Sequence, residues 1–516
     1  MNAKLESKAL TRIMLCSAVI CALLLSLVHL TGDLYGDEGH TYRVVSGDFW
    51  DYEWSPYMGH PPLYFALAKA GYWASGGRPW GIRLPSLVFS LGAVVLLPLV
   101  ARRLLGQRQS LLVAWLAATS PALLEFSAEG RPYAMLMFFG AAFIGALHAF
   151  LQRESKSTAL VLAATAAGGM LTYYLFVFLV VAGVIYYLIF RRRVTHYALL
   201  AGGLVCLTAV LMLPLVFRHF WGQSVHFRQQ GTYPIWTMLL RVPVALSFGY
   251  AAIEPSEMDL ARNVRLGMLK QNWHVLVLAG LAMLSIVYAL IVLIRRKQPW
   301  VWFLIVATAV PMALGIVARL GGVAILREKY FFAIWGPFLL LISLALAHLA
   351  TRKWGCACIA AYVALVVLSL VHFTGYADVY SRRTNTSGLV AHINARATGC
   401  DVVLQFRIPP EPSHDRFSGL RRDLRRIGIE SSRPAEVSLE AYLTDLSSSV
   451  AGRIYLISEE LARNLVDPDL VIKKKLLEIR DVESIPFGRN LILYVAAPKN
   501  PSSVMPTSPL TRPAGG

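Results

Sequence analysis

Hydrophobic runs long enough to cross a bilayer recur along the first three quarters of the chain, separated by short polar connections. A helix needs about 20 consecutive apolar residues to span roughly 30 Å of hydrocarbon. The pattern therefore predicts a polytopic α-helical membrane protein with about 11 transmembrane helices. The runs lie near residues 13–31, 84–101, 110–124, 133–151, 158–172, 175–190, 197–217, 274–294, 299–318, 331–350 and 355–375.

The pattern changes near Ser381, where long apolar runs give way to short segments of mixed polarity. The segments "CDVVLQF", "GRIYLIS" and "NLILYVAA" predict β-strands, whereas "DRFSGLRRDLRRIG" and "SEELARNLV" predict amphipathic helices. We therefore expect a transmembrane domain at 1–380, with a first outer loop at 32–82, and a small soluble α/β domain at 381–500. The Pro- and Ser-rich stretch at 501–516 is expected to be a disordered tail.

Composition supports the membrane assignment, because 56% of the 516 residues are hydrophobic, only 15% are charged, and the mean hydropathy is +0.54. A net charge of +19 is also typical of proteins that bind nucleic acid. Many of the basic residues, however, stand in short clusters between the apolar runs, so no nucleic-acid partner is expected. The six cysteines show neither a disulfide framework nor the spacing of a zinc site.

The basic clusters also predict the orientation of the chain, because they lie in every second connection between the apolar runs and therefore on one side of the membrane. The positive-inside rule then places the N-terminus in the cytoplasm and the C-terminal domain on the opposite, outer side. The clusters are Lys4, Lys8 and Arg12; Arg102, Arg103 and Arg108; Arg153 and Lys156; Arg191, Arg192 and Arg193; Arg295, Arg296 and Lys297; and Arg352 and Lys353.

Two adjacent carboxylates, Asp37 and Glu38, follow the first apolar run on the predicted outer side, in "LYGDEGHTYRVVSGDFW". Acids at this place are good helix-start residues, because they bind free amide groups and oppose the helix dipole. A catalytic role is the alternative interpretation. In the same loop, His60 precedes a fixed turn made by Pro61 and Pro62, either as a ligand or as an interfacial polar residue.

Two later connections carry further polar residues on the predicted outer side. "SAEGRPYAM" contains Glu129, Arg131 and Tyr133, and its guanidinium either binds a ligand or marks the headgroup boundary. "LREKYFFAIWGP" contains Arg327 and Lys329, which stand where the positive-inside rule disfavours cations. Cations placed against that trend indicate an anionic ligand, most simply a lipid phosphate.

These motifs together resemble those of the GT-C glycosyltransferases. The resemblance rests on the acidic pair, the "HPPLY" turn, the "RLPS" element at 83–86, the "RPY" element at 131–133, and the basic residue before Tyr330. Within that superfamily the chain is most similar to the bacterial branch related to protein O-mannosyltransferases and to the transferases that add aminoarabinose or galacturonate to lipid A. The resemblance covers about residues 10–375 as architecture and is specific mainly at 34–90 and 127–134.

The resemblance implies inverting transfer of a sugar from a polyprenyl-phosphate donor to an acceptor hydroxyl, at the outer face of a bacterial cytoplasmic membrane. The acceptor, whether lipid, glycan or protein, is unknown. The implied roles are Asp37 as general base, Glu38 as its orienting partner or a sugar ligand, Arg131, Arg327 and Lys329 as donor phosphate ligands, and His60, Glu129, Tyr133, Tyr42 and Tyr330 as substrate-binding residues. A divalent cation is considered at His60 and Glu129, but the metal is left unassigned.

Other functions remain open from the sequence. A transporter or flippase of lipid-linked glycans shares the aromatic and basic residues, although it should need polar residues along the membrane path and repeated halves. A structural or assembly protein would use the acidic pair only as helix caps. A ligase of the O-antigen type would place its chemistry in a large late outer loop.

Overall fold

The computed structural model describes residues 2–34, 38–47, 61–191, 193–227, 235–249, 273–295, 299–320, 328–374, 386–407, 420, 423–430, 450, 452–459, 476–477, 480–486 and 491–498. The chain divides into two compact units, Met1–Gly375 and Tyr376–Gly516. The first is a helical bundle and the second is built on a β-sheet.

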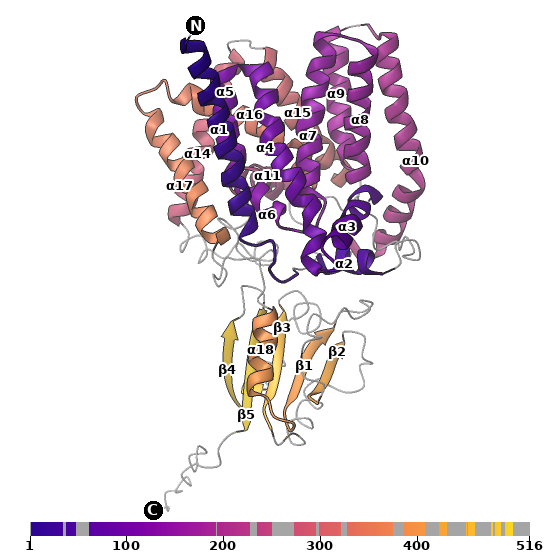
Figure 1. Ribbon diagram of the computed structural model, residues 1–516, viewed down its shortest axis with the longest axis vertical. Coiled ribbons are helices and arrows are strands. Elements are labelled where there is room, and N and C mark those ends of the chain that lie inside the picture. The colour runs from indigo at the N-terminus through magenta and orange to yellow at the C-terminus, as the bar shows by residue number, and fades with distance from the viewer. Residues whose placement is uncertain are drawn as a thin grey trace, which may run out of the picture. The chain divides into compact units, whose positions relative to one another are not determined.

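Helices of the first unit occupy the predicted apolar runs, and Figure 1 shows them bundled with their long axes roughly parallel. Five of the described helices are long and apolar enough to cross a membrane, or six if one bent pair counts as a single span. The protein is therefore a polytopic helical membrane protein, whereas the number of 11 spans stays a prediction. The helices are α1 (Asn2–Leu27), α4 (Leu84–Leu105), α5 (Gln107–Ala118), α6 (Pro121–Ser127), α7 (Tyr133–Gln152), α8 (Lys156–Thr172), α9 (Phe176–Arg191), α10 (His196–Phe227), α14 (Trp273–Arg295), α15 (Pro299–Leu320), α16 (Trp335–Leu349) and α17 (Gly355–Thr374).

The bent pair lies in the third predicted run, where the chain turns by 50° between α5 and α6. Thr119 and Ser120 interrupt the helix, and the Ser120 hydroxyl accepts a hydrogen bond from the amide of Leu123. Pro121 then occupies the first turn of α6, where its missing amide hydrogen costs nothing. A capping serine followed by proline thus explains the break.

Shorter elements lie between the long helices: α2 (Glu38–Ser46), α3 (Pro62–Ala74), the 3-10 helix η1 (Pro79–Arg83), α11 (Ile235–Phe248) and the 3-10 helix η2 (Glu328–Ile334). Figure 1 shows α2 and α3 at the end of the bundle where α1 terminates, and we call this the α2 end. They pack there through a small apolar cluster around Val45, Tyr64, Ala68, Ile82 and Met135.

Close backbone packing holds η2 against α7. A β-carbon at Gly140, on α7, would lie 2.0 Å from the carbonyl oxygen of Ala333, on η2. Only glycine permits this approach. The position of η2 matters because it carries Lys329 and Tyr330.

The second unit contains one five-stranded sheet of order β2-β1-β3-β5-β4. β1 (Val402–Arg407) pairs in parallel with β2 (Arg425–Glu430) and β3 (Ile454–Glu459), and β5 (Leu491–Pro498) runs antiparallel to β3 and β4 (Arg480–Pro486). The helix α18 (Thr386–Arg396) covers one face of the sheet (Figure 1), burying Leu389 and Ile393 against Tyr455.

Two helix predictions in this unit are partly wrong. The end of "DRFSGLRRDLRRIG", residues 425–428, belongs to β2, because Ile427 and Ile429 alternate along a strand that pairs with β1. Ser458 and Glu459, which begin "SEELARNLV", still belong to β3. The remaining residues of that segment lie outside the described residues.

Candidate functional site

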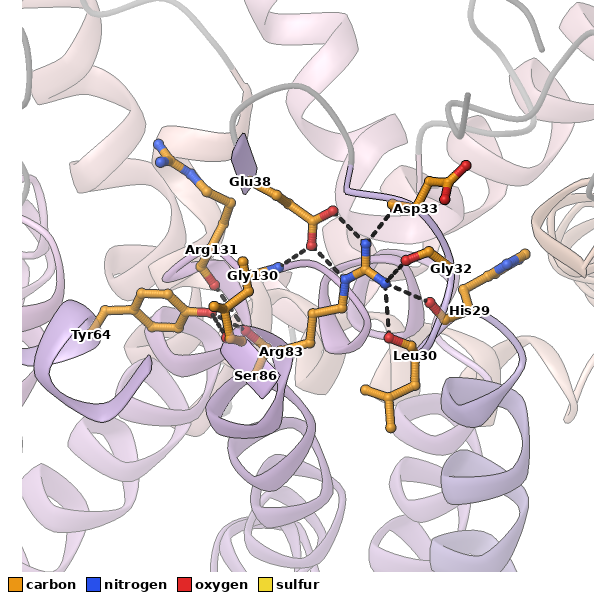
Figure 2. Close-up of polar contacts among 11 residues, drawn as sticks. His29, Leu30, Gly32, Asp33, Glu38, Tyr64, Arg83, Ser86, Gly130 and Arg131 are labelled. Carbon is orange, nitrogen blue, oxygen red and sulfur yellow. Dashed lines mark hydrogen bonds and ion pairs between the residues drawn. The ribbon is translucent and has the colours of Figure 1, made fainter. Parts of the chain in front are cut away.

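A buried ion pair joins the start of α2 to the last residue of η1, directly before α4. The Arg83 guanidinium donates from Nε to Oε1 of Glu38 and from Nη2 to Oε2, each at 2.7 Å, and Figure 2 shows this two-pronged contact. The two side chains are 0% and 1% exposed, respectively. Two parallel charge-assisted hydrogen bonds fix direction as well as distance, so Glu38 is held in one orientation.

The same guanidinium donates hydrogen bonds to backbone carbonyls in the stretch that follows α1. Nη1 donates to the carbonyl oxygens of His29, Leu30 and Gly32, at 3.1, 2.8 and 2.7 Å, and Nη2 donates to that of Asp33 at 2.6 Å. These carbonyl groups lie in the turn that follows α1, which ends at Leu27. Arg83 supplies donors to this stretch and so holds the backbone that directly follows α1 (Figure 2).

A second set of contacts ties the connection between α6 and α7 to the ion pair. The Gly130 amide donates to Oε1 of Glu38 at 2.5 Å. The Ser86 hydroxyl donates to the carbonyl oxygen of Arg131 at 3.1 Å and also meets the Tyr64 hydroxyl at 2.8 Å. Residues from α2, α3, α4 and this connection therefore form a continuous hydrogen-bonded group (Figure 2).

Two charged side chains of the connection, Glu129 and Arg131, are also buried, at 9% and 4% exposure. Burial raises the pKa of the Tyr64 hydroxyl, the negative charges of Glu38 and Glu129 favour the same direction, and Arg131 opposes it. Tyr64 therefore stays protonated and donates to the carbonyl oxygen of Ile82 at 3.1 Å.

The residues that follow Arg131 include part of an aromatic group. Residues of η2 contact this group, which places η2 at the same end of the bundle. The Lys329 ammonium lies 5.4 Å from the centre of the Tyr133 ring, within the range of a cation–π interaction. The Tyr330 ring stacks on that of Tyr173 at 5.7 Å, and the centres of the Tyr173 and Tyr133 rings are 6.4 Å apart. Cationic and aromatic groups from separate connections thus meet here.

The structure places the predicted site residues unevenly. Six of the ten lie at the α2 end within the contacts just described, namely Glu38, Glu129, Arg131, Tyr133, Lys329 and Tyr330. Tyr42, on α2 at the same end, packs in the apolar cluster with its ring against Tyr72 at 5.7 Å, and burial raises the pKa of its hydroxyl. Asp37, His60 and Arg327 lie outside the described residues.

Sequence reasoning missed two parts of this site. Arg83 was noted only as part of the "RLPS" element that opens a span, and its pairing with Glu38, 45 residues away, leaves no local signal. Tyr173 was missed as well, although "LTYYLF" places two tyrosines between apolar runs at 158–172 and 175–190. That doublet was the available signal.

The possible metal site receives no support from the geometry. Within the described ranges, no three His, Cys, Asp or Glu side chains come together in a way that could hold a metal ion. Glu129 is described, but His60 is not, so the pair considered from the sequence is untested.

Comparison with known proteins gives matches to a family and to solved structures. Residues 59–215 match the family described as dolichyl-phosphate-mannose-protein mannosyltransferase. None of the curated protein sequences matches the chain.

Among solved structures, apo ArnT from Cupriavidus metallidurans matches 96% of this chain and 100% of its own, with 12% identity and a TM-score of 0.50. The same protein bound to undecaprenyl phosphate matches 95% and 99%, with 10% identity and a TM-score of 0.48. The oligosaccharyltransferase of Archaeoglobus fulgidus, in complex with Zn and sulfate, matches 92% and 74%, with 11% identity and a TM-score of 0.48. The resemblance to GT-C glycosyltransferases is confirmed at the level of the fold.

Proposed function

We propose, from the GT-C fold as the premise, that this protein is a membrane glycosyltransferase. It transfers a sugar from a polyprenyl-phosphate donor to an acceptor hydroxyl, with inversion at the anomeric carbon. The reaction takes place at the α2 end of the bundle, where the lipid tail of the donor can stay in the bilayer while its phosphate lies at the surface.

The observation that carries this proposal is the buried pair of Arg83 and Glu38. Burying two charges is expensive, and we infer that this pair is retained because it fixes the position of Glu38. Glu38 directly follows Asp37 in the chain, so the pair anchors the residue next to the proposed base. The role of Glu38 is then to position Asp37, because both of its oxygens are engaged by Arg83 and Gly130.

The proposed chemistry needs one base and a stabilised leaving group. The Asp37 carboxylate takes the proton of the acceptor hydroxyl as its oxygen forms a bond to the anomeric carbon. The bond between that carbon and the phosphate oxygen breaks, and its electron pair leaves with the polyprenyl phosphate. Arg131, Arg327 and Lys329 are proposed to stabilise this charge, which is why no second acid is required.

The remaining predicted residues are proposed to shape the substrate cavity. Tyr133 and Tyr330 belong to the aromatic group beside Lys329 and are suited to contact the sugar. Glu129 and His60 are proposed as ligands of sugar hydroxyls, with the metal unassigned. Tyr42 is proposed to support this cavity from the apolar cluster.

The α2 end is proposed to face away from the cytoplasm of a bacterial cell, with the unit at 376–516 on that same side, because the basic clusters favour this orientation. Two exposed cysteines provide the test: Cys400 in the second unit and Cys356 at the start of α17. A membrane-impermeant maleimide should label Cys400 but not Cys356 in intact spheroplasts. Labelling of Cys356 alone would reject this orientation.

The activity is tested with Asp37→Asn. Wild type and variant, purified in lipid, are offered a panel of polyprenyl-phosphate sugars with crude envelope acceptors, and released polyprenyl phosphate is followed by mass spectrometry. The variant should be slower by about 10²–10⁴-fold, because general-base catalysis contributes that much.

Asp33→Asn is the matched control, because the carbonyl of Asp33, rather than its carboxylate, meets Arg83. If wild type and Asp37→Asn released polyprenyl phosphate equally, Asp37 would not be the general base. Movement of the donor between leaflets without release would favour the flippase over the transferase.

A further inference from the structure

A groove of about 660 Å³ lies on the sheet of the second unit, on the face that α18 partly covers. Tyr455, Val495 and Ala497 line it from β3 and β5. Tyr455 and Val495 are paired across these strands, so they share one face. This face continues beyond α18 toward β4.

The two walls of the groove carry opposite charges. Glu483 and Asp481 pair with Val495 and Ala497 across β4 and β5, so both carboxylates stand on the groove face. Arg396, from the last turn of α18, lines the opposite wall. The groove is therefore dipolar, with acceptors along β4 and guanidinium donors facing them.

His392 belongs to the basic wall without adding a charge to it. Its Nε2 atom lies 3.1 Å from Nη1 of Arg396. A guanidinium only donates, so Nε2 accepts and the imidazole is neutral. Burial lowers the pKa of His392, the charge of Arg396 adds to this, and Glu483 opposes it.

The second guanidinium, that of Arg453, stands on a loop that is held firmly in place. Asp401 accepts from the amide of Arg453 at 2.5 Å and from that of Thr398 at 2.7 Å. Arg480 donates to the carbonyl oxygens of Gly452 at 2.6 Å and Val450 at 2.5 Å. The groove is thus bordered by a preorganised loop.

We propose that this groove binds an anionic saccharide. Its carboxylate or phosphate is held by Arg396 and Arg453, which present planar donors suited to such groups. Its hydroxyls donate to Asp481 and Glu483, whose ionised carboxylates only accept. The two guanidinium and two carboxylate charges cancel, which favours a ligand with one anionic group over a polyanion. The proposal is independent of the transfer reaction at the α2 end.

The test is calorimetric titration of the full chain in lipid nanodiscs with galacturonate, which carries one carboxylate and several hydroxyls. Saturable binding is expected to wild type. Arg396→Ala should weaken it at least about tenfold, since a charge-assisted hydrogen bond is lost. The double variant Asp481→Asn, Glu483→Gln should weaken binding as well, because acceptors for the saccharide hydroxyls are lost. If binding were only an attraction between opposite charges, removing these two negative charges would not weaken it.

The matched control is Arg425→Ala, because Arg425 is an exposed arginine on β2, at the opposite edge of the same sheet. It should leave binding unchanged, and galactose, the neutral counterpart of the same sugar, should bind at least about tenfold more weakly than galacturonate. The proposal is overturned if no saturable binding occurs, if Arg425→Ala and Arg396→Ala have equal effects, or if inorganic phosphate alone binds as tightly as galacturonate.

Discussion

The two ends of the helical bundle each hold a carboxylate–guanidinium pair, and the pairs differ in burial and in the geometry of their contact. At the α2 end, Arg83 and Glu38 are at most 1% exposed and meet through two bonds of 2.7 Å. At the opposite end, Arg191 and Glu154 are 38% and 13% exposed and meet at 3.2 Å. Arg191 also donates to the carbonyl of Leu151.

This difference separates an ion pair that adds a little stability from an ion pair that fixes the position of a side chain. A pair near the surface is screened by solvent and is worth about 0–1 kcal/mol. A buried pair gains little net stability over apolar residues of the same size, but it is costly to break and it fixes geometry. The α2 end, where the chemistry is proposed, therefore carries the pair that specifies position.

The largest effect is expected from Arg83→Ala, which leaves the Glu38 carboxylate buried without its guanidinium. We expect a loss of about 3–5 kcal/mol in stability, seen as a lower midpoint of thermal unfolding in detergent, together with loss of transfer activity. Adding Glu38→Gln removes the stranded charge, so the double variant should be more stable than Arg83→Ala.

Activity distinguishes positioning from simple stability in these variants. The double variant should recover stability without recovering transfer, because no ion pair then holds residue 38 and, through it, the neighbouring Asp37. Recovery of both would mean that the pair only stabilises the fold. An Arg83→Ala protein that unfolds at the same temperature as wild type would contradict the comparison of the two ends.

A smaller effect is expected from Lys329→Met, which keeps side-chain length and removes the charge. The apparent affinity for the donor should fall roughly ten- to a hundredfold, because a charge-assisted contact to phosphate is lost, while stability changes little. The measurement is donor titration in the release assay. Lys329→Arg should retain most of the affinity.

Lys69→Met is the matched control, since the Lys69 ammonium lies the same 5.4 Å from the ring of Trp73 as the Lys329 ammonium does from Tyr133. The two variants remove the same charge from the same kind of contact. If both change donor affinity equally, the effect belongs to the surface charge of the α2 end and the phosphate role of Lys329 is rejected.

The smallest effect is expected from Arg191→Ala, the counterpart of Arg83→Ala at the opposite end. Its loss of stability should be within about 1 kcal/mol, because solvent screens a pair whose guanidinium is partly exposed, and transfer should be unchanged. Thermal unfolding and the release assay measure both quantities. A drop as large as that of Arg83→Ala would mean that burial does not separate the two pairs.

Much of this fold could be predicted from hydrophobic pattern alone. Runs of apolar residues specify membrane helices strongly, because an unpaired backbone cannot cross hydrocarbon, and helices occupy those runs. The break between α5 and α6 depends on two local residues, Ser120 and Pro121, that a hydropathy window averages away. β2 was read as helix because its arginines resemble a polar helix face, whereas its strand state comes from pairing with β1.

The candidate site could be predicted only in part. Glu129, Arg131, Tyr133, Lys329 and Tyr330 stood out because polar residues are conspicuous between apolar runs. Arg83, the partner of Glu38, did not stand out, because an arginine before a span can equally be a headgroup anchor. Long-range pairs of this kind are properties of the packed structure.

The contacts of Arg83 also set an order of events during synthesis. Residues 29–38 emerge from the ribosome well before Arg83, and Gly130, the other donor to Glu38, emerges later still. Until both have been made and inserted, the turn after α1 and the Glu38 carboxylate lack the donors that they have in the finished protein. The proposed active end is therefore completed only after α4 and the start of α7 have joined the bundle, so a ribosome stalled earlier would hold a chain without this site.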